Sequence, residues 1–381
     1  MIYFDNAASG GRKPDCVQDA VRSAIKVCAN PGRSGHALAL SCALAVQAAR
    51  EELNRFFGGY SYERVVFTKN CTEALNIALL GTLKQGDHVV TTPLEHNSVL
   101  RPLEHLKQLG VITYDVCPLS SDGNVSPQAI AALVRPNTRL VAVTAASNVT
   151  GIAPPLRKIR AMLPDDTLFL CDGAQGGGHI PIDMQGAGID LLTLAGHKGL
   201  FAVQGSGALL FSERVNPEPL FFGGTGSLSL SLDMPDFYPD RLEAGTVSFP
   251  AISSLLEGIR YLSAEFEHAQ KRTHELTAYL IDKLSALPVY HVYSRPNASG
   301  IVAFKHENVQ SETLAAVLSS RYGIAVRGGL HCAPLTHRAL GTLEGGLVRV
   351  SFSHFNSKTE IDELVSALSA LQLPDAFSDL L

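Results

Sequence analysis

Two short polar segments in the middle of the chain carry side chains that could perform acid–base or covalent chemistry. Residues 171–175 read Cys-Asp-Gly-Ala-Gln, and residues 195–198 read Ala-Gly-His-Lys. Each segment ends a hydrophobic run typical of a buried strand. Because open α/β sheets bind ligands at the carboxyl ends of their strands, we expect Asp172 and Lys198 to face one crevice.

A lysine and a carboxylate in one crevice fit the requirements of pyridoxal phosphate. The lysine forms a Schiff base with this cofactor, and the carboxylate keeps the ring nitrogen protonated, which makes the ring a stronger electron sink. Taken singly, an Asp more often caps a turn and a Lys more often lies in solvent. Together with the segments described next, Asp172 and Lys198 favour the cofactor.

A phosphate group needs a helix N-terminus, where free backbone N–H groups and the helix dipole favour an anion. The strand-like run 64–67 is followed by Asn70, Cys71 and Thr72 at the start of a predicted helix. Asn70 and Glu73 also fit a capping box, which explains the same residues without a ligand. For this segment alone, the capping box is therefore the better explanation.

A further side chain suited to this cofactor is His96, which follows the strand-like run 88–91 at the same expected sheet edge. An imidazole there could stack on the cofactor ring. A histidine after a strand is more often a hydrogen-bonded structural residue, so His96 alone is weak support.

The segment 327–334, Arg-Gly-Gly-Leu-His-Cys-Ala-Pro, lies between a predicted strand and a predicted helix. Two adjacent glycines permit a sharp loop that would present Cys332 outward. As a thiolate, Cys332 would be a strong nucleophile, favoured if Arg327, His331 or the following helix lowers its pKa. The alternative is a buried loop cysteine in an enzyme of other chemistry.

The remaining six of the seven cysteines show no paired spacing typical of disulfides or a zinc site, and we expect them to be reduced packing residues. They are Cys16, Cys28, Cys42, Cys71, Cys117 and Cys171.

Composition and charge narrow the class of protein. Of the 381 residues, 46% are hydrophobic and 18% charged, which is typical of a compact globular protein. The length predicts two packed subdomains or one large domain with an appendage. A formal net charge of -5 and the lack of a Lys/Arg cluster argue against a nucleic-acid binder. The N-terminus lacks the features of a signal peptide, and no apolar run could span a bilayer, so we expect a cytoplasmic protein with a small-molecule substrate and no membrane or metal partner.

Hydrophobic runs that alternate with helical stretches predict an α/β fold with a largely parallel sheet. Because the later strands are joined by short connections, we expect a mixed sheet with one antiparallel strand. After residue 250, a long amphipathic stretch leads into a smaller α+β region. We predict an N-terminal segment 1–14 that packs with the small domain, a large domain 15–250 and a small domain 251–381. The predicted strands are 64–67, 88–91, 111–116, 140–145, 168–171, 191–194 and 207–211, then 289–293, 301–304, 324–327 and 347–352.

With these motifs in place, the chain resembles the class V aminotransferase-like enzymes, specifically the cysteine desulfurases and selenocysteine lyases of the SufS-like type. The resemblance runs from residues 3–8, Tyr-Phe-Asp-Asn-Ala-Ala, to Arg349 and the last helix. It implies pyridoxal-phosphate fold type I, with a large domain and a smaller C-terminal domain, and a homodimer with cofactor sites at its interface.

The resemblance also implies a role for each matching residue. Lys198 is the Schiff-base lysine, Asp172 the partner of the ring nitrogen, Gln175 a donor to the ring hydroxyl, and His96 the stacking imidazole and a carrier of protons. Thr72, the backbone of Cys71 and His197 hold the phosphate, and Thr246 reaches the phosphate of the neighbouring subunit. Asn148 and Arg349 bind the substrate carboxylate, for which the planar fork of an arginine is well suited. Cys332 receives the sulfur.

Two positions depart from the family pattern. Relatives commonly have Ser before the Gly-His-Lys, where this chain has Ala195, so one hydroxyl contact to the phosphate is missing and cofactor retention is expected to be weaker. Cys71 stands where Gly or Thr is usual, which matters less because its backbone N–H would bind the phosphate.

The activity that follows is a cysteine desulfurase, in which L-cysteine gives L-alanine and its sulfur passes to Cys332 as a persulfide and then to an acceptor protein or a reductant. The sequence separates this poorly from a selenocysteine lyase acting on L-selenocysteine. A cysteine lyase that releases pyruvate and sulfide would not need Cys332, and a non-catalytic descendant would be expected to have lost Lys198 or Asp172.

Two further segments stay without a defined role. Residues 223–238 could line the substrate pocket. Arg33 and His36 could approach the site, although capping of the following helix is the default explanation for them.

Overall fold

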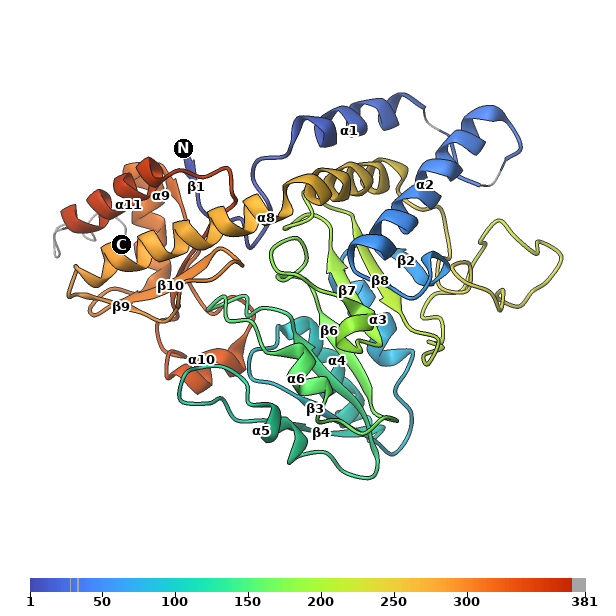
Figure 1. The fold of residues 1–381 in the computed structure, drawn as a ribbon, viewed down its shortest axis with the longest axis horizontal. Coiled ribbons are helices and arrows are strands. Elements are labelled where there is room, and N and C mark those ends of the chain that lie inside the picture. The colour runs from blue at the N-terminus through green and yellow to red at the C-terminus, as the bar shows by residue number, and fades with distance from the viewer. Residues whose placement is uncertain (28, 33, 372–381) are drawn as a thin grey trace.

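The computed structural model describes residues 1–27, 29–32 and 34–371. Figure 1 shows a large sheet with helices on its two sides and, at the other end of the molecule, a smaller group of strands and helices that contains the C-terminal elements. One long helix runs across both regions.

The elements follow the sequence pattern closely. The strands are β1 (Ile2–Tyr3), β2 (Val65–Thr68), β3 (Asp87–Thr91), β4 (Ile112–Val116), β5 (Thr138–Thr144), β6 (Leu168–Asp172), β7 (Leu191–Ala195), β8 (Gly207–Phe211), β9 (Tyr290–Val292), β10 (Ile301–His306), β11 (Ile324–Ala325) and β12 (Val348–Ser351). The helices are α1 (Asp15–Val27), α2 (Ala37–Phe56), α3 (Cys71–Leu80), α4 (Asn97–Gln108), α5 (Pro127–Ala131), α6 (Leu156–Arg160), α7 (Met184–Ala187), α8 (Phe249–Ser285), α9 (Ser311–Tyr322), α10 (Pro334–Leu340) and α11 (Lys358–Ala370), with a short 3-10 turn at Tyr62–Arg64.

The large sheet has seven strands in the order β2-β8-β7-β6-β5-β3-β4. Strands β3 to β7 pair in parallel, and β8 is antiparallel to both of its neighbours, β2 and β7. The expected mixed sheet with one antiparallel strand is therefore confirmed. It arises because β7 and β8 are joined by a connection too short for a parallel crossover.

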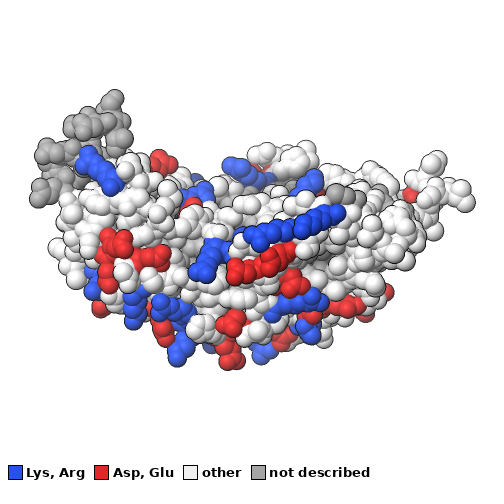
Figure 2. All heavy atoms as spheres, turned by 90° about the horizontal axis from the view of Figure 1, so that it is seen from above, with Lys and Arg blue, Asp and Glu red and all other residues white. Residues whose placement is uncertain are grey.

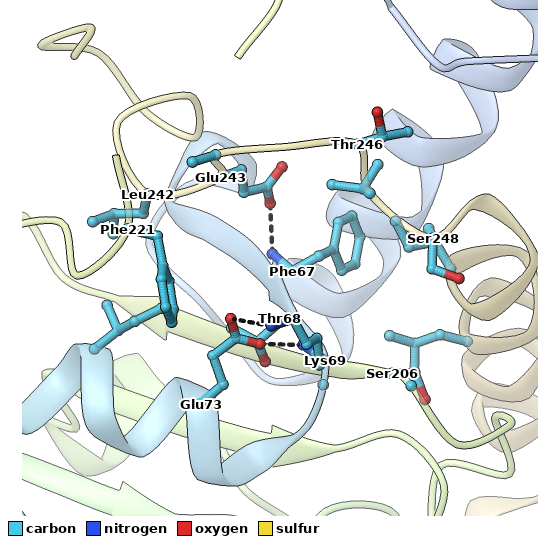
Figure 3. A pocket seen from close by; sticks show the side chains of 17 residues that line it. Phe67, Thr68, Lys69, Glu73, Ser206, Phe221, Leu242, Glu243, Thr246 and Ser248 are labelled. Atoms are coloured by element: carbon cyan, nitrogen blue, oxygen red, sulfur yellow. Dashed lines mark hydrogen bonds and ion pairs between the residues drawn. The ribbon is translucent and has the colours of Figure 1, made fainter. Parts of the chain in front are cut away.

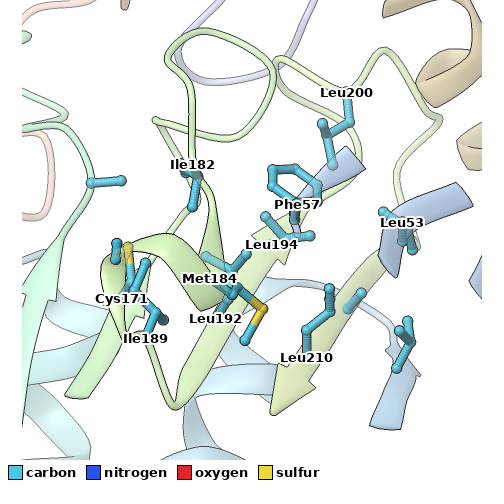
Figure 4. Close-up of a cluster of buried hydrophobic side chains, with 14 of the residues drawn as sticks. Leu53, Phe57, Cys171, Ile182, Met184, Ile189, Leu192, Leu194, Leu200 and Leu210 are labelled. Atoms are coloured by element: carbon cyan, nitrogen blue, oxygen red, sulfur yellow. The ribbon is translucent and has the colours of Figure 1, made fainter. Parts of the chain in front are cut away.

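The large sheet is apolar on both faces, which explains the nearly unbroken hydrophobic runs of its strands. In β8, Ala208 and Leu210 belong to one core cluster and Leu209 and Phe211 to the other. Figure 4 shows the first cluster, in which side chains of β7 and β8 pack against residues of α2 and of the connections after β6 and β7. Because both faces are covered, the carboxyl ends of the parallel strands are held in fixed positions.

The smaller region contains an antiparallel sheet, β12-β10-β9, and a pair of parallel strands, β1 and β11. The N-terminal Phe4 is buried in the core of this region with residues of β10, β12 and α11. Helix α8 packs against α1 and α2 with its first part and against β9 and β10 with its later part (Figure 1). It begins two residues before the predicted domain boundary, and the division at 14 and 250 stays a prediction.

The surface in Figure 2 shows Lys and Arg side chains mixed with Asp and Glu side chains. Among the described helices, none has the length and hydropathy to cross a membrane. In the same residues there is no cluster of three or more His, Cys, Asp or Glu that could hold a metal ion.

Candidate functional site

A cavity lies at the carboxyl ends of β5, β6 and β7, beside the start of α3 and α4. It brings together most of the residues predicted from the sequence. Those that line it are Cys71, Thr72, His96, Asn148, Asp172, Gln175, His197, Lys198 and Arg349. Cys332 and Thr246 do not line it.

Asp172 is the last residue of β6 and is 2% exposed. Its Oδ1 accepts hydrogen bonds from Ala174 N at 2.9 Å and from the thiol of Cys71 at 3.5 Å. Burial lowers the pKa of Lys198, and the nearby Asp172 carboxylate opposes that shift. Among the described residues, no hydrogen bond or ion pair holds the Lys198 ammonium, so the amine is available to a ligand in the cavity.

The start of α3 offers free backbone donors to the cavity. Asn70 caps the helix by accepting a hydrogen bond from Glu73 N at 2.9 Å, as the sequence suggested. The prediction of a full capping box is wrong, because the Glu73 carboxylate accepts from Lys69 N and not from the backbone N–H of the N-cap, Asn70. Within the part of the chain that the structure describes, Cys71 N and Thr72 N keep no protein acceptor, as the first turn of a helix requires.

The imidazole of His96 is fixed by the helix that follows it. His96 is the N-cap of α4, and its Nδ1 accepts from Ser98 N at 3.0 Å. A backbone N–H can only donate, so Nδ1 carries no proton and the neutral ring carries its hydrogen on Nε2. Burial lowers the pKa of His96 to about 4, and the charge of Lys198 adds to this shift while Asp172 opposes it. His96 therefore caps a helix and also lines the cavity, while its stacking on a cofactor ring stays a prediction.

The N-terminal segment closes one side of the cavity. Gln175 donates to Ala7 O at 2.9 Å, which leaves its second amide N–H for a ligand. His197 Nδ1 lies 3.3 Å from Ser9 Oγ, and its carbonyl accepts from Gly10 N. Burial lowers the pKa of His197 to about 4, with the charges of Lys198 and Lys13 adding to this shift.

Arg349 and Asn148 form the wall that faces the smaller region. Arg349 is 1% exposed and donates to Asn148 O and to the Asp5 carboxylate, each at 2.9 Å. The Asn148 amide donates to His331 O at 2.6 Å. A guanidinium has five N–H groups, so three remain after these two bonds and can hold a carboxylate.

Cys332 lies on the loop between β11 and α10, with its thiol exposed. The interpretation of a buried loop cysteine is therefore wrong. His331 and Cys332 have φ values of 51° and 58°, in the left-handed region that non-glycine residues rarely adopt. Three hydrogen bonds hold this conformation, from Asn97 N to Cys332 O, from Asn148 to His331 O, and from His331 Nε2 to Leu347 O.

Thr246 lies in a second pocket, on the segment that leads into α8 (Figure 3). In that pocket the Glu243 carboxylate accepts from Phe67 N and pairs with Arg50. The position of Thr246 outside the cavity of its own chain is compatible with the role across a subunit interface that the resemblance implies. Residues 223–238 do not line the cavity either.

The other cysteines behave only partly as expected. Cys42, Cys117 and Cys171 are buried, while Cys16 is exposed on α1, which corrects the prediction that it packs in a core. Cys71 is buried but does more than pack, because its thiol contacts Asp172 and Thr193. Cys28 and Arg33 lie outside the described residues.

The default explanation for His36 is confirmed. It is the N-cap of α2, and its Nδ1 accepts from Ala39 N at 3.2 Å.

Several residues were not predicted as members of the site, among them Thr144 and His331, which line the cavity. Arg327 and Ser98 line the cavity, and Asp5 pairs with Arg349. Arg327 stands in the recognised loop motif, so its position could have been found, but Ser98 and Asp5 carry no local signal of a ligand site.

The cavity fits pyridoxal phosphate. It combines an unpaired, half-buried amine at Lys198, a buried carboxylate at Asp172, an imidazole at His96, and free N–H donors at the start of α3. These groups match an aldehyde carbon, a pyridinium nitrogen, an aromatic ring and a phosphate.

Solved structures share this architecture across nearly the whole chain. An apo cysteine desulfurase from Thermococcus onnurineus NA1 has a TM-score of 0.88 and 30% identity, with 97% of this chain and 94% of that one covered. The cysteine desulfurase CsdA from Escherichia coli has a TM-score of 0.87 and 27% identity, with 96% and 93% covered. Fold type I of the pyridoxal-phosphate enzymes, expected from the resemblance, is confirmed.

The chain belongs to the aminotransferase class-V family, whose model matches residues 2–364. Among curated relatives, a probable cysteine desulfurase of Methanothermobacter thermautotrophicus is 34% identical over 97% of this chain and 94% of the relative. A probable cysteine desulfurase of Halalkalibacterium halodurans is 31% identical over 97% and 92%.

Proposed function

We propose that this protein is a pyridoxal-phosphate-dependent cysteine desulfurase that carries sulfur on Cys332. The observation that carries the proposal is the convergence of Lys198, Asp172 and His96 in one cavity, with the Cys332 loop joined to its wall through Asn148. The names of the relatives and of the solved structures point to the same substrate, L-cysteine.

The proposed reaction breaks the Cβ–S bond of L-cysteine and forms an S–S bond on Cys332. The Cys332 thiolate attacks the sulfur of L-cysteine, an S–S bond forms, and the Cβ–S bond breaks with its electron pair left on carbon. Protonation of that carbon completes L-alanine, and Cys332 becomes a persulfide. The atoms balance as thiol plus cysteine giving persulfide plus alanine, without an outside oxidant.

The residues of the cavity supply binding and proton transfer. Bound pyridoxal phosphate would be held covalently by Lys198, at its ring nitrogen by Asp172, and at its phosphate by Thr72, Cys71 N and His197, and would supply the electron sink for the substrate carbanion. The remaining N–H groups of Arg349 and the second amide N–H of Asn148 bind the substrate carboxylate.

Lys198 would remove the proton from the substrate Cα and return it. Burial lowers the pKa of Lys198, so a larger fraction of the amine is neutral and able to accept a proton at the working pH. His96, neutral with its hydrogen on Nε2, is placed to donate that hydrogen toward the reacting atoms. The lowered pKa keeps this tautomer neutral over the physiological range.

We also propose a homodimer in which Thr246 reaches the phosphate site of the other subunit. Its support is the resemblance together with the position of Thr246 outside its own cavity. The exposed Cys332 thiol suits transfer of the persulfide sulfur to an acceptor protein, and a cytoplasmic location is proposed from the sequence alone.

Product analysis tests the function. The wild-type protein is supplied with L-cysteine and a thiol reductant, and alanine, pyruvate and sulfide are measured together. We expect alanine and sulfide in equal amounts, with turnover reduced by at least about 1000-fold in Cys332→Ala, because the nucleophile is gone. Cys16→Ala is the matched control, since Cys16 is also exposed but lies on α1. Pyruvate and sulfide at an undiminished rate in Cys332→Ala would overturn the proposal in favour of a cysteine lyase.

A further inference from the structure

Three side chains of the cavity wall are linked in a row. Thr72 Oγ1 lies 2.8 Å from Ser98 Oγ, and Ser98 Oγ lies 2.9 Å from His96 Nδ1. All three line the cavity, Thr72 from the first turn of α3 and the other two from the start of α4. Ser98 therefore connects the start of α3, where an anion could bind, with the imidazole of His96, which could stack on an aromatic ring.

Hydroxyl groups are scarce on this wall. Of the described residues that line the cavity, Thr72, Thr144 and Ser98 are the ones with hydroxyls. The Thr144 hydroxyl is committed to backbone carbonyls, those of Ala146 and Asp172. Ala195, on the same cavity, has no polar side-chain atom. Of these three hydroxyls, those of Thr72 and Ser98 are therefore the two that are not bonded to backbone carbonyls.

The hydrogens of this row can be assigned by counting donors. Each hydroxyl has one hydrogen, and His96 Nδ1 is an acceptor because Ser98 N–H donates to it. When Thr72 turns its hydrogen toward an anion, its oxygen can accept the hydrogen of Ser98. That hydrogen is then no longer given to His96 Nδ1, which keeps the bond from Ser98 N alone.

We propose that Ser98 is a positioning residue that couples the anion site at Thr72 to the imidazole of His96. This inference rests on the proposed function, because it assigns the anion to the cofactor phosphate. The Ser98 hydroxyl donates to the Thr72 oxygen and so orients the Thr72 hydroxyl as a donor to the phosphate. When the phosphate is bound, the Ser98 hydroxyl therefore no longer donates to His96 Nδ1. The hydrogen bonds to the His96 imidazole therefore depend on whether the phosphate site is occupied.

The test compares the wild-type protein with Ser98→Ala, Ser98→Thr and Ser41→Ala. Ser98→Thr retains a hydroxyl at the site. Ser41→Ala is the matched control, because Ser41 lies near the start of α2, which also has a histidine cap, and its hydroxyl donates to Leu38 O away from the cavity. Two quantities are measured on the cofactor-free full-length chain: the affinity for inorganic phosphate, and the change in the ¹⁵N resonance of His96 Nδ1 when phosphate is added.

We expect Ser98→Ala to bind phosphate about five- to tenfold more weakly, the cost of one hydrogen bond, and to lose most of the phosphate-induced change at His96. Ser98→Thr should recover both, and Ser41→Ala should match the wild type. Unchanged phosphate affinity in Ser98→Ala, or an equal change at His96 in that variant and the wild type, would overturn the proposal. Failure of the proposed function would look different, because the wild-type chain would then not bind pyridoxal phosphate although its phosphate response at His96 could persist.

Discussion

The two halves of the candidate site are built in opposite ways. Asp172 and Lys198 stand at or just after the ends of parallel strands that are buried on both faces, so their backbones are fixed by the central sheet. Cys332 is itself exposed and stands on a loop with two consecutive left-handed residues, held by hydrogen bonds rather than by a sheet. The cofactor half, with Asp172 and Lys198, is fixed by the strands themselves. The cysteine half, with Cys332, has a strained backbone that neighbouring residues hold in place.

Under the proposed function, the difference follows from the two tasks of the site. Proton transfer at a bound ring requires atoms held within a fraction of an ångström, which strand ends provide. A sulfur carrier must meet the substrate and later an outside acceptor, which requires an exposed position. Asn148 joins the halves, because its carbonyl accepts from Arg349 and its amide donates to the Cys332 loop.

The largest expected difference between the two halves comes from replacing Lys198 in the cofactor half. Lys198→Ala should lower turnover by at least about 1000-fold, because both the covalent link to the cofactor and the proton carrier are lost. The reaction of Cys332 with iodoacetamide should keep its wild-type rate, since the loop does not depend on Lys198. Borohydride reduction followed by mass spectrometry should trap the cofactor on Lys198 in the wild type and in the surface control Lys158→Ala. Trapping on another lysine would contradict the assignment.

The cysteine half can be loosened through His331, a residue of the loop that also lines the cavity. His331 is 3% exposed, and its Nε2 donates to Leu347 O. His331→Ala leaves that carbonyl without its donor, which should cost about 1–3 kcal/mol of stability and lower turnover several-fold while the absorbance of the bound cofactor is unchanged.

The control for this variant is His291→Ala, which removes an exposed imidazole from β9. Loss of cofactor absorbance in His331→Ala would show that the two halves are not separable in this way. Steady-state turnover, cofactor absorbance and unfolding in urea, measured on the same samples, distinguish the outcomes.

The strands and the strand-end motifs could be predicted because both depend on local signals. The run at 168–171 is wholly apolar and the run at 191–194 is interrupted only by Thr193, and they become β6 and β7 within one residue. The weakest strand prediction was 324–327, where β11 covers only Ile324 and Ala325. There the chain leaves the strand early to enter the glycine loop.

The pairing of distant side chains could not be predicted. Arg349 and Asp5 are separated by 344 residues, and Thr72 and Ser98 meet only because α3 and α4 start at the same sheet edge. His36 and His96 could not be told apart from local sequence either, since both cap a helix through Nδ1. What distinguishes them is the cavity on the other side of His96, which no local pattern reveals.

Acid should weaken the cysteine half through the same His331. Burial lowers the pKa of His331 to about 2, with the charge of Arg349 adding to the shift, against an ordinary value of 6.5. Between these values the unfolded chain binds a proton that the folded chain excludes. The free energy of unfolding therefore falls as the pH drops below 6.5, by up to about 1.4 kcal/mol per pH unit for one histidine.

Other groups contribute to the total slope, so the difference between variants is the test. Burial raises the pKa of Glu95 to about 8, which gives a slope of the opposite sign because the folded chain then holds the extra proton. Urea unfolding at pH 7, 6 and 5 should show a shallower loss of stability in His331→Ala than in the wild type, while His291→Ala keeps the wild-type slope. Parallel slopes in all three proteins would mean that the loop tolerates a protonated His331, and the left-handed conformation at Cys332 would then need a support other than the bond to Leu347.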